Sequence, residues 1–386
     1  MEAEIVAITL RLFNSKEKGC GSMTSGGTES ILMACKAFRD YARTNRGITE
    51  PELVVPVTAH AAFDKACAYF CIRLVHVPVD PVSFRAIPEK MAAAITANTI
   101  GLVCSAPSYA QGVVDPVEDL AAIAVARGLP LHVDCCLGSF LISFAARAGF
   151  PQPRPFDFRV PGVTSISCDT HKYGFSPKGT SLIMYSDPAF RRAQYFTAPE
   201  WTGGIYASPT IAGSRAGANI AATWATIMRV GARGYEDAAR TILETAKKIR
   251  EGIAAGKATT SIAVCGEPNL SVVAFAPARG SSINIFNVGD AMKERGWDLN
   301  TLQNPAGLHI CITFANAHEA AARFLVDLKA AVDDVMTAPP GKFKNGTGAF
   351  YGLAASIPDK SLVRQVSFFF LDALYKTGYS EKGSPL

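Results

Sequence analysis

A short apolar strand ends in a His-Lys pair within the stretch Ser165-Ile-Ser-Cys-Asp-Thr-His171-Lys172-Tyr-Gly-Phe-Ser-Pro-Lys178-Gly179. Similar short apolar segments lie on both sides of it along the chain, and amphipathic helix patterns separate most of them. Strand patterns cover 53–57, 72–77, 100–104, 129–133, 163–167 and 181–185, and helix patterns cover 30–44, 60–71, 86–97 and 117–127. This alternation predicts an α/β fold, with a mostly parallel sheet that helices cover on both faces.

The pattern changes beyond residue 235. A long helix is predicted near 234–255, and strands near 261–265, 270–276 and 308–313 then alternate with helices near 287–296, 317–336 and 359–375. A stretch rich in Gly, Pro and Lys predicts a loop over 340–347. We therefore expect two domains, a large one formed by residues 1–235 and a smaller α+β domain formed by residues 236–386.

The composition suits a protein with a sizeable core. The chain has 386 residues, of which 49% are hydrophobic and 18% charged, and this balance argues against intrinsic disorder. The net charge of +5 is spread along the chain and does not favour a nucleic-acid partner. The ten cysteines lie mostly in apolar segments without a CxxC pair, so we expect buried reduced thiols and no zinc site. The uncharged stretch 91–114 contains proline and amide side chains, and we interpret it as a helix end, a strand and a loop rather than a membrane helix.

Three polar residues follow predicted strands directly, namely His60, Asp134 and Lys172. Ligands of parallel sheets bind outside the carboxyl ends of the strands, so these side chains are candidates for one shared site. A lysine there can form a Schiff base with pyridoxal phosphate, provided that burial and nearby cations lower its pKa. A carboxylate there can keep the pyridine nitrogen protonated, and an imidazole can stack on the ring or transfer a proton.

Each of these residues also has a purely structural interpretation. Lys172 is an ordinary solvated lysine in that interpretation, Asp134 caps the next turn, and His60 is hydrogen-bonded at the start of a helix. His76 and His132 lie inside strand patterns, and for both we favour the structural role.

Two further segments carry phosphate-binding or contact signals. Gly26-Gly27-Thr28 opens the helix at 30–44, where backbone N–H groups and the helix dipole attract an anion; the alternative is an ordinary helix start capped by Thr28 or Ser25. His171 and Lys178 add positive charge, although Lys178 also suits a solvated loop. The glycine-rich segment 203–215, which contains Tyr206 and Ser214, predicts a functional loop or a subunit contact rather than a simple connection.

Together these segments resemble the sphingosine-1-phosphate lyases, a family of the pyridoxal-phosphate-dependent group II decarboxylase superfamily. The resemblance extends from residue 1 to about residue 375. The matching runs are Thr24-Ser-Gly-Gly-Thr-Glu-Ser, Ala59-His-Ala-Ala-Phe, Leu131-His-Val-Asp, Thr164-Ser-Ile-Ser-Cys-Asp-Thr-His-Lys-Tyr-Gly, Gly203-Gly-Ile-Tyr-Ala-Ser-Pro-Thr and Gly296-Trp-Asp-Leu-Asn-Thr-Leu-Gln. The superfamily shares the Asp and the His-Lys pair, whereas the Gly-Gly-Ile-Tyr run is specific to the lyases.

The resemblance implies the fold of type I pyridoxal-phosphate-dependent transferases and a homodimer. It implies that Lys172 forms the Schiff base, Asp134 pairs with the pyridine nitrogen and His60 stacks on the ring. The cofactor phosphate would be held by Gly27, Thr28 and His171, and by Ser214 of the partner subunit. Lys178 is the candidate for the substrate phosphate, and Tyr206 is expected to line the catalytic site.

The implied reaction is a retro-aldol cleavage of phosphorylated sphingoid bases into a long-chain aldehyde and phosphoethanolamine. The base for the C3 hydroxyl is left open between Lys172, a tyrosine and a phosphate group. The alternatives are an amino-acid decarboxylase of the same superfamily, acting on glutamate or an aromatic amino acid, and a truncated form that binds the cofactor without turnover. Family members carry a segment before the position of Met1, and eukaryotic ones a membrane anchor further upstream. We expect a cytoplasmic enzyme, or one at the cytosolic face of the endoplasmic reticulum in an anchored form.

Overall fold

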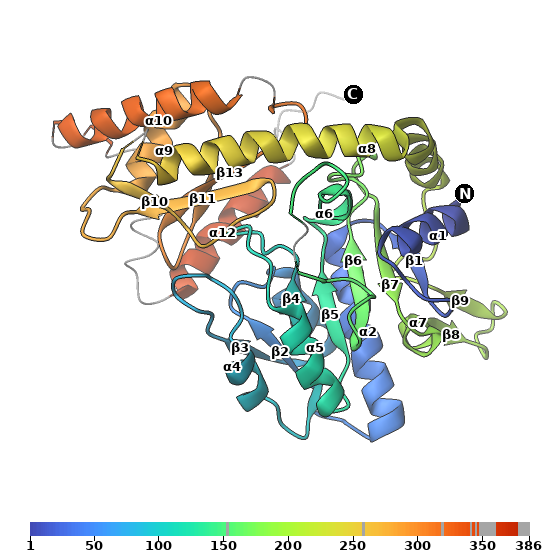
Figure 1. The fold of residues 1–386 in the computed structure, drawn as a ribbon. Coiled ribbons are helices and arrows are strands. Elements are labelled where there is room, and N and C mark those ends of the chain that lie inside the picture. Colours follow the sequence, from blue (N-terminus) through green and yellow to red (C-terminus); the bar gives the residue numbers. More distant parts are fainter. Residues whose placement is uncertain are drawn as a thin grey trace, which may run out of the picture.

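The computed structural model describes residues 1–151, 154–256, 259–317, 320–339, 342–343, 346 and 360–376. Its larger sheet has seven strands in the order β1-β7-β6-β5-β4-β2-β3 (Figure 1). The bounds are β1 Cys20–Thr24, β2 Glu52–Pro56, β3 Arg73–Val77, β4 Thr99–Ser105, β5 Leu131–Asp134, β6 Val163–Cys168 and β7 Ser181–Tyr185. The neighbouring strands from β3 to β6 pair in parallel, and β7 is antiparallel to both β6 and β1. The predicted mostly parallel sheet is therefore confirmed.

Helices cover both faces of this sheet, because neighbouring strand residues point to opposite sides. On β2, for example, Val54 belongs to one buried cluster while Leu53 and Val55 belong to another. The second cluster is closed by α2 and α3, and the first by α1, α5, α6 and α8. The helices of this unit are α1 Glu2–Leu12, α2 Gly27–Arg46, α3 Ala62–Phe70, α4 Pro88–Ala93, α5 Val117–Ala126, α6 Ser139–Phe144 and α7 Pro188–Gln194.

A second, antiparallel sheet follows later in the chain. Its strand order is β10-β11-β13-β12. The helix α9 Ile285–Glu294 contacts β13, and α10 Ala320–Thr337 contacts α9. The strands are β10 Ile262–Val264, β11 Val272–Pro277, β12 Asn300–Leu302 and β13 Gly307–Cys311, and α12 Lys360–Leu374 lies near the end of the chain. This is the α+β arrangement expected for the second part of the sequence. The predicted loop at 340–347 falls largely outside the described residues.

The long helix α8 Gly217–Ala254 contacts both units, with α1 and α6 on one side and α10 and β10 on the other (Figure 1). The sequence-based start near 234 was wrong. The helix begins 17 residues earlier and is kinked at Gly231, whose φ of 61° only glycine adopts readily. The kink interrupts the apolar periodicity, which explains why only the second half gave a clear helical signal.

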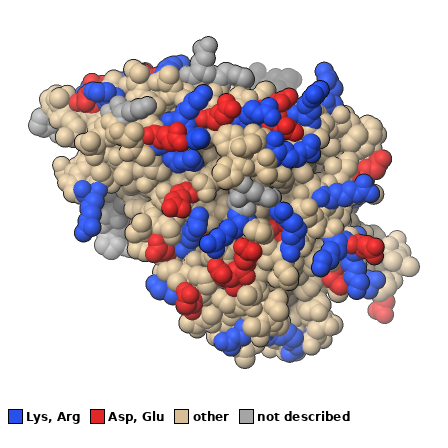
Figure 2. All heavy atoms as spheres, in the orientation of Figure 1, with Lys and Arg blue, Asp and Glu red and all other residues tan. Residues whose placement is uncertain are grey.

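The distribution of charge on the surface and the burial of the cysteines are mostly as the sequence predicted. Figure 2 shows basic and acidic side chains intermixed on the displayed face. All ten cysteines are free thiols and eight are buried; Cys71, at the end of α3, is exposed and so departs from the expectation.

Within the described residues, no helix is long and apolar enough to cross a membrane. In the same part of the chain, no group of three or more His, Cys, Asp or Glu side chains is placed to hold a metal ion.

Candidate active site

A cavity of about 300 Å³ lies at the carboxyl ends of the parallel strands. Segments that are far apart in the sequence meet there: the turn before α2, the segment before α3, the loops after β4 and β5, and the stretch after β6. Six of the residues singled out from the sequence line it, namely Gly27, Thr28, His60, Asp134, His171 and Lys172. The parallel sheet thus brings the candidates from four separate segments into one site.

Lys172 forms an ion pair inside this cavity. Its Nζ lies 2.9 Å from Oδ2 of Asp169, a side chain that is only 2% exposed. Burial by itself would lower the pKa of Lys172, but the Asp169 carboxylate outweighs it, and the pKa is raised above its ordinary value. The expectation that burial and nearby cations lower this pKa is wrong in this structure, because the nearest charge is an anion.

Asp134 ends β5 and is held through one oxygen. Its Oδ1 accepts hydrogen bonds from the backbone N–H of Cys136 at 3.0 Å and from the hydroxyl of Ser167 at 3.2 Å. Among the described residues, no hydrogen bond reaches Oδ2, and that oxygen suits an N–H donor of a ligand in the cavity. Asp134 therefore combines the turn-capping role with a position at the cavity wall.

His132, two residues earlier on β5, has the structural role that we favoured. Its ring is buried between the hydroxyls of Ser165 and Ser167, at 2.8 and 3.2 Å from Nδ1 and Nε2. Burial lowers the pKa of His132 to about 4, so the ring is neutral near pH 7. His76 is also outside the site: its Nε2 lies 3.1 Å from Asp64 on the surface.

The turn before α2 forms the floor of the cavity. Gly26 has a φ of 152°, and a β-carbon at Gly27 would lie 2.8 Å from both Oδ1 of Asp169 and the sulfur of Cys136. Because α2 begins at Gly27, its first N–H groups have no helical acceptor and present a positive dipole end. His171 lies against this turn; its Nδ1 accepts the N–H of Thr180 at 3.2 Å, and its Nε2 lies 3.5 Å from Oδ2 of Asp169.

His60 has the hydrogen bond at the start of a helix that its structural interpretation expects, and it also lines the cavity. Its Nδ1 accepts the backbone N–H of Ala62 at 3.1 Å, where α3 begins, and its ring is exposed toward the cavity. The ring stands edge-on to Tyr109, with ring centroids 6.4 Å apart.

Three predicted residues do not line this cavity in the single chain. Tyr206 lies on the short strand β9 Tyr206–Ser208 and packs edge-on against Trp201. Ser214 lines a separate cavity of about 160 Å³, which shares Ser25 and Glu29 with the first one. Lys178 is exposed and does not reach the wall.

The sequence reasoning missed Tyr109, Cys136 and Asp169, which also line the cavity. Tyr109 follows β4, and its hydroxyl donates to Oδ1 of Asn300 at 3.0 Å. Each of the three lies within a few residues of a predicted strand end, which is the signal that could have identified them.

These groups fit pyridoxal phosphate. A carboxylate oxygen is directed at the cavity for a pyridinium N–H, a lysine amine for the aldehyde, and a helix N-terminus beside a histidine for the phosphate. Glycine at position 27 is required for the last of these, since any β-carbon would collide with Asp169 and Cys136.

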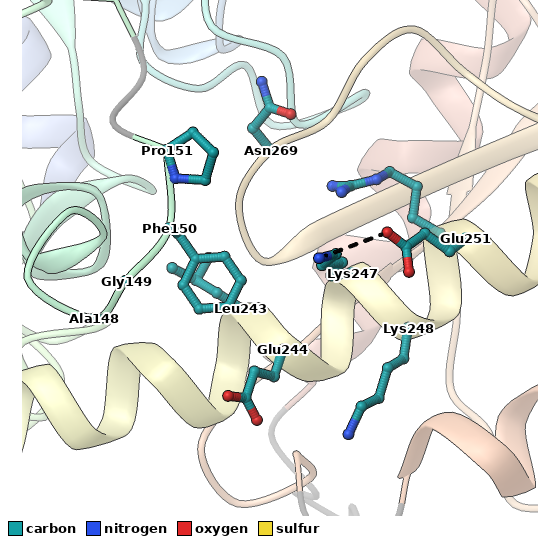
Figure 3. Close-up of a pocket in the computed structure, with 11 residues that line it drawn as sticks. Ala148, Gly149, Phe150, Pro151, Leu243, Glu244, Lys247, Lys248, Glu251 and Asn269 are labelled. Atoms are coloured by element: carbon teal, nitrogen blue, oxygen red, sulfur yellow. Dashed lines mark ion pairs between the residues drawn. The ribbon is translucent and has the colours of Figure 1, made fainter.

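A larger cavity of about 530 Å³ lies elsewhere, between α8, the segment around Phe150 and Asn269 (Figure 3). Its charged side chains come from α8 and are of both signs; Lys247 pairs with Glu251 at 3.8 Å, and Arg250 donates to the carbonyl of Pro268. None of the residues singled out from the sequence lines it.

The chain is similar to known proteins over most or all of its length. The model of the pyridoxal-dependent decarboxylase conserved domain matches residues 2–277. The chain is 46% identical to sphingosine-1-phosphate lyase 1 of Rattus norvegicus, over all of this chain and 67% of the rat protein. It is 44% identical to sphingosine-1-phosphate lyase of Saccharomyces cerevisiae, over 99% of this chain and 64% of that protein.

The chain is also similar to solved structures. The sphingosine-1-phosphate lyase of Burkholderia pseudomallei superposes with a TM-score of 0.87 at 38% identity, over 98% of this chain and 81% of that one. The glutamate decarboxylase of Lactobacillus brevis superposes with a TM-score of 0.73 at 21% identity, over 88% of this chain and 80% of that one, which shows a shared fold alone. The chain therefore belongs to the sphingosine-1-phosphate lyase family of pyridoxal-phosphate-dependent enzymes.

Proposed function

We propose that this chain cleaves the Cα–Cβ bond of phosphorylated sphingoid bases, such as sphinganine 1-phosphate, and releases a long-chain aldehyde and phosphoethanolamine. One observation carries the proposal. Lys172, Asp134 and the N-terminus of α2 line a single cavity, in a chain that is 46% identical to sphingosine-1-phosphate lyase 1 of Rattus norvegicus. Such a cleavage leaves an electron pair on Cα, and it needs an electron sink next to an amine-binding group.

Each residue has a distinct task in this proposal. Pyridoxal phosphate, when bound, supplies the electron sink. Lys172 provides the amine that attaches it, and Asp134 keeps a proton on the ring nitrogen through Oδ2. The N–H groups of Gly27 and Thr28 hold the phosphate together with His171, and His60 covers one side of the ring.

The proton of the C3 hydroxyl must be removed by a group that reaches the cavity. Tyr206 lies outside it in the single chain, whereas Tyr109 lines it beside His60. Within one chain, Tyr109 is therefore the tyrosine that joins Lys172 as a candidate base, and a phosphate oxygen remains the third. We assign the binding of the substrate phosphate to Lys178, which is exposed and lies six residues after Lys172.

A homodimer completes the proposal. Ser214 and Tyr206 are exposed in a segment that also carries the exposed apolar residues Trp201, Ile205 and Ile211. A partner subunit would cover these apolar side chains and bring Ser214 to a second cofactor site. A cytoplasmic location, or one at the cytosolic face of the endoplasmic reticulum in an anchored form, stays part of the proposal.

The decisive experiment measures phosphoethanolamine release from sphinganine 1-phosphate by the purified 386-residue chain with added pyridoxal phosphate. We expect release that Lys172→Ala abolishes and Lys248→Ala, an exposed lysine of α8, leaves unchanged. Carbon dioxide release from glutamate or an aromatic amino acid would instead identify a decarboxylase. Cofactor binding without turnover of any of these substrates would identify the inactive form.

A further inference from the structure

Asp169 contacts the side chains of both Lys172 and His171, although its own side chain is almost completely buried. It follows β6 directly, and its Oδ2 lies 2.9 Å from Nζ of Lys172 and 3.5 Å from Nε2 of His171. The two partners are also neighbours in sequence, so a single carboxylate oxygen sets the direction of both.

The backbone of Asp169 is held by a neighbouring side chain, whereas one of its two carboxylate oxygens has no hydrogen bond among the described residues. The hydroxyl of Ser139 donates to the backbone carbonyl of Asp169 at 2.5 Å. Oδ1 is buried, has no hydrogen-bond partner among the described residues, and lies against Gly27, where a β-carbon would approach it to 2.8 Å. The polar contacts of this carboxylate to Lys172 and His171 are therefore both made through Oδ2.

A buried carboxylate is costly unless a cation compensates it, and removal of one partner leaves an uncompensated charge. In this cavity the compensation comes mainly from Lys172, since its nitrogen is the nearer of the two. The attraction acts on the protonated form of the amine only. Asp169 therefore opposes loss of that proton, and the pKa of Lys172 is raised accordingly, against the effect of burial.

We propose that Asp169 is the positioning residue of Lys172: it directs the amine into the cavity and sets the pH at which that amine becomes unprotonated and reactive. The inference rests on the proposed function in so far as Lys172 is the cofactor lysine. Asp169 acts through Lys172 and takes no part in bond cleavage. The cavity around Lys172 is lined by other titratable groups as well. They come from the start of α2, the segment before α3, the loop after β4, the end of β5 with the loop that follows it, and the stretch after β6; these groups are Glu29, His60, Tyr109, Asp134, Cys136 and His171.

The test measures the reactivity of individual lysines without any turnover. The full chain, freed of cofactor, is treated with a trace of acetic anhydride at pH values from 7 to 11, and acetylation at Lys172 and Lys178 is quantified by peptide mass spectrometry. In the unsubstituted chain we expect the acetylation rate of Lys172 to keep rising through this range, whereas the rate for a free lysine peptide levels off near its ordinary pKa of about 10.4. In Asp169→Asn the whole Lys172 profile should move to lower pH. Acetylation of Lys172 at pH 8 should then be about tenfold faster if the midpoint of the profile falls by one on the pH scale.

Three controls make the result specific. Lys178 in the same sample reports general changes in reagent or accessibility, and Asp119→Asn, an exposed aspartate of α5, should move neither profile. Circular dichroism establishes that Asp169→Asn is folded. If that variant does not fold, the unsubstituted chain still decides, since a midpoint for Lys172 equal to that of a free lysine peptide would overturn the proposal. An unchanged Lys172 profile in a folded Asp169→Asn chain would overturn it as well, whether or not the chain proves to be a lyase.

Discussion

Asp134 and Ser167 lie directly opposite each other at the ends of the parallel strands β5 and β6, and the Ser167 hydroxyl donates a 3.2 Å hydrogen bond to Oδ1 of Asp134. The same hydroxyl lies 3.2 Å from Nε2 of the buried His132. Ser167 thus links the carboxylate at the cavity wall to the interior of the sheet. The register of β5 and β6 therefore places the hydroxyl that orients the Asp134 carboxylate in the site.

Replacement of Ser167 by alanine should therefore affect both the fold and the site. It leaves Nε2 of His132 without a partner and removes one of the two bonds on Asp134, so we expect the free energy of unfolding to fall by about 1–3 kcal/mol. Urea unfolding measures this, and an absorbance titration should show weaker binding of pyridoxal phosphate. Ser143→Ala, which removes a hydroxyl that donates within α6, is the matched control. An unchanged affinity in Ser167→Ala would mean that Asp134 is oriented without Ser167.

A second prediction concerns the floor of the cavity. Gly27→Ala places a β-carbon 2.8 Å from Oδ1 of Asp169 and from the sulfur of Cys136, and it must push one of them or the helix start away. We expect the affinity for pyridoxal phosphate to fall by about tenfold or more, which corresponds to roughly 1.4 kcal/mol. Gly217→Ala, at a helix start where a β-carbon meets nothing within 4 Å, should leave the affinity unchanged. Equal affinities in both variants would show that the turn adapts.

The buried His132 gives the protein a pH dependence of defined sign. Because its pKa is about 4 in the folded chain and about 6.5 in the unfolded chain, the unfolded state binds a proton first as the pH falls. The stability that the neutral ring contributes is present above pH 6.5 and is lost between about pH 6.5 and 4. The full effect is about 3 kcal/mol.

Asp115 acts in the opposite direction over part of this window, since burial raises its pKa to about 6 and the folded chain then gains a proton first. The observable is therefore the difference between the unsubstituted chain and His132→Gln, in urea unfolding at pH 8, 6 and 5. We expect this difference to be largest at pH 8 and to shrink toward pH 5. A constant difference would contradict a neutral buried ring.

The proposed dimer predicts complementation between two inactive chains. We expect Lys172→Ala to lack turnover, and we expect Ser214→Trp to lack it because the bulky ring enters the partner's cofactor site. A mixture refolded together would contain heterodimers in which one site has both an intact Lys172 and an intact Ser214 from the other chain. Phosphoethanolamine release should then reappear in the mixture. Continued inactivity, with dimers present by light scattering, would place Ser214 in its own chain's site.

Most of the fold could be predicted from the sequence, because buried strands and amphipathic helices each have a short-range pattern. Six of the strands in the large sheet lie within a few residues of the predicted positions. The strand β1 was missed, since the sequence before α2 is short, mixed in polarity and paired only with the distant β7. The start of α8 was missed because Gly231 breaks the periodicity.

The sequence by itself determined that His60, Asp134 and Lys172 meet, because each follows a strand and parallel strands present their carboxyl ends at one edge. It did not determine which charge would stand beside Lys172. Asp169 and Gly27 are far apart in the chain, and their contact depends on how α2 packs across the ends of β5 and β6. The tertiary structure alone decided that contact. It also brought Cys136 and Asp134 close enough to add to the rise in the pKa of Lys172 that its sequence neighbour Asp169 causes, since electrostatic interactions depend on distance in space.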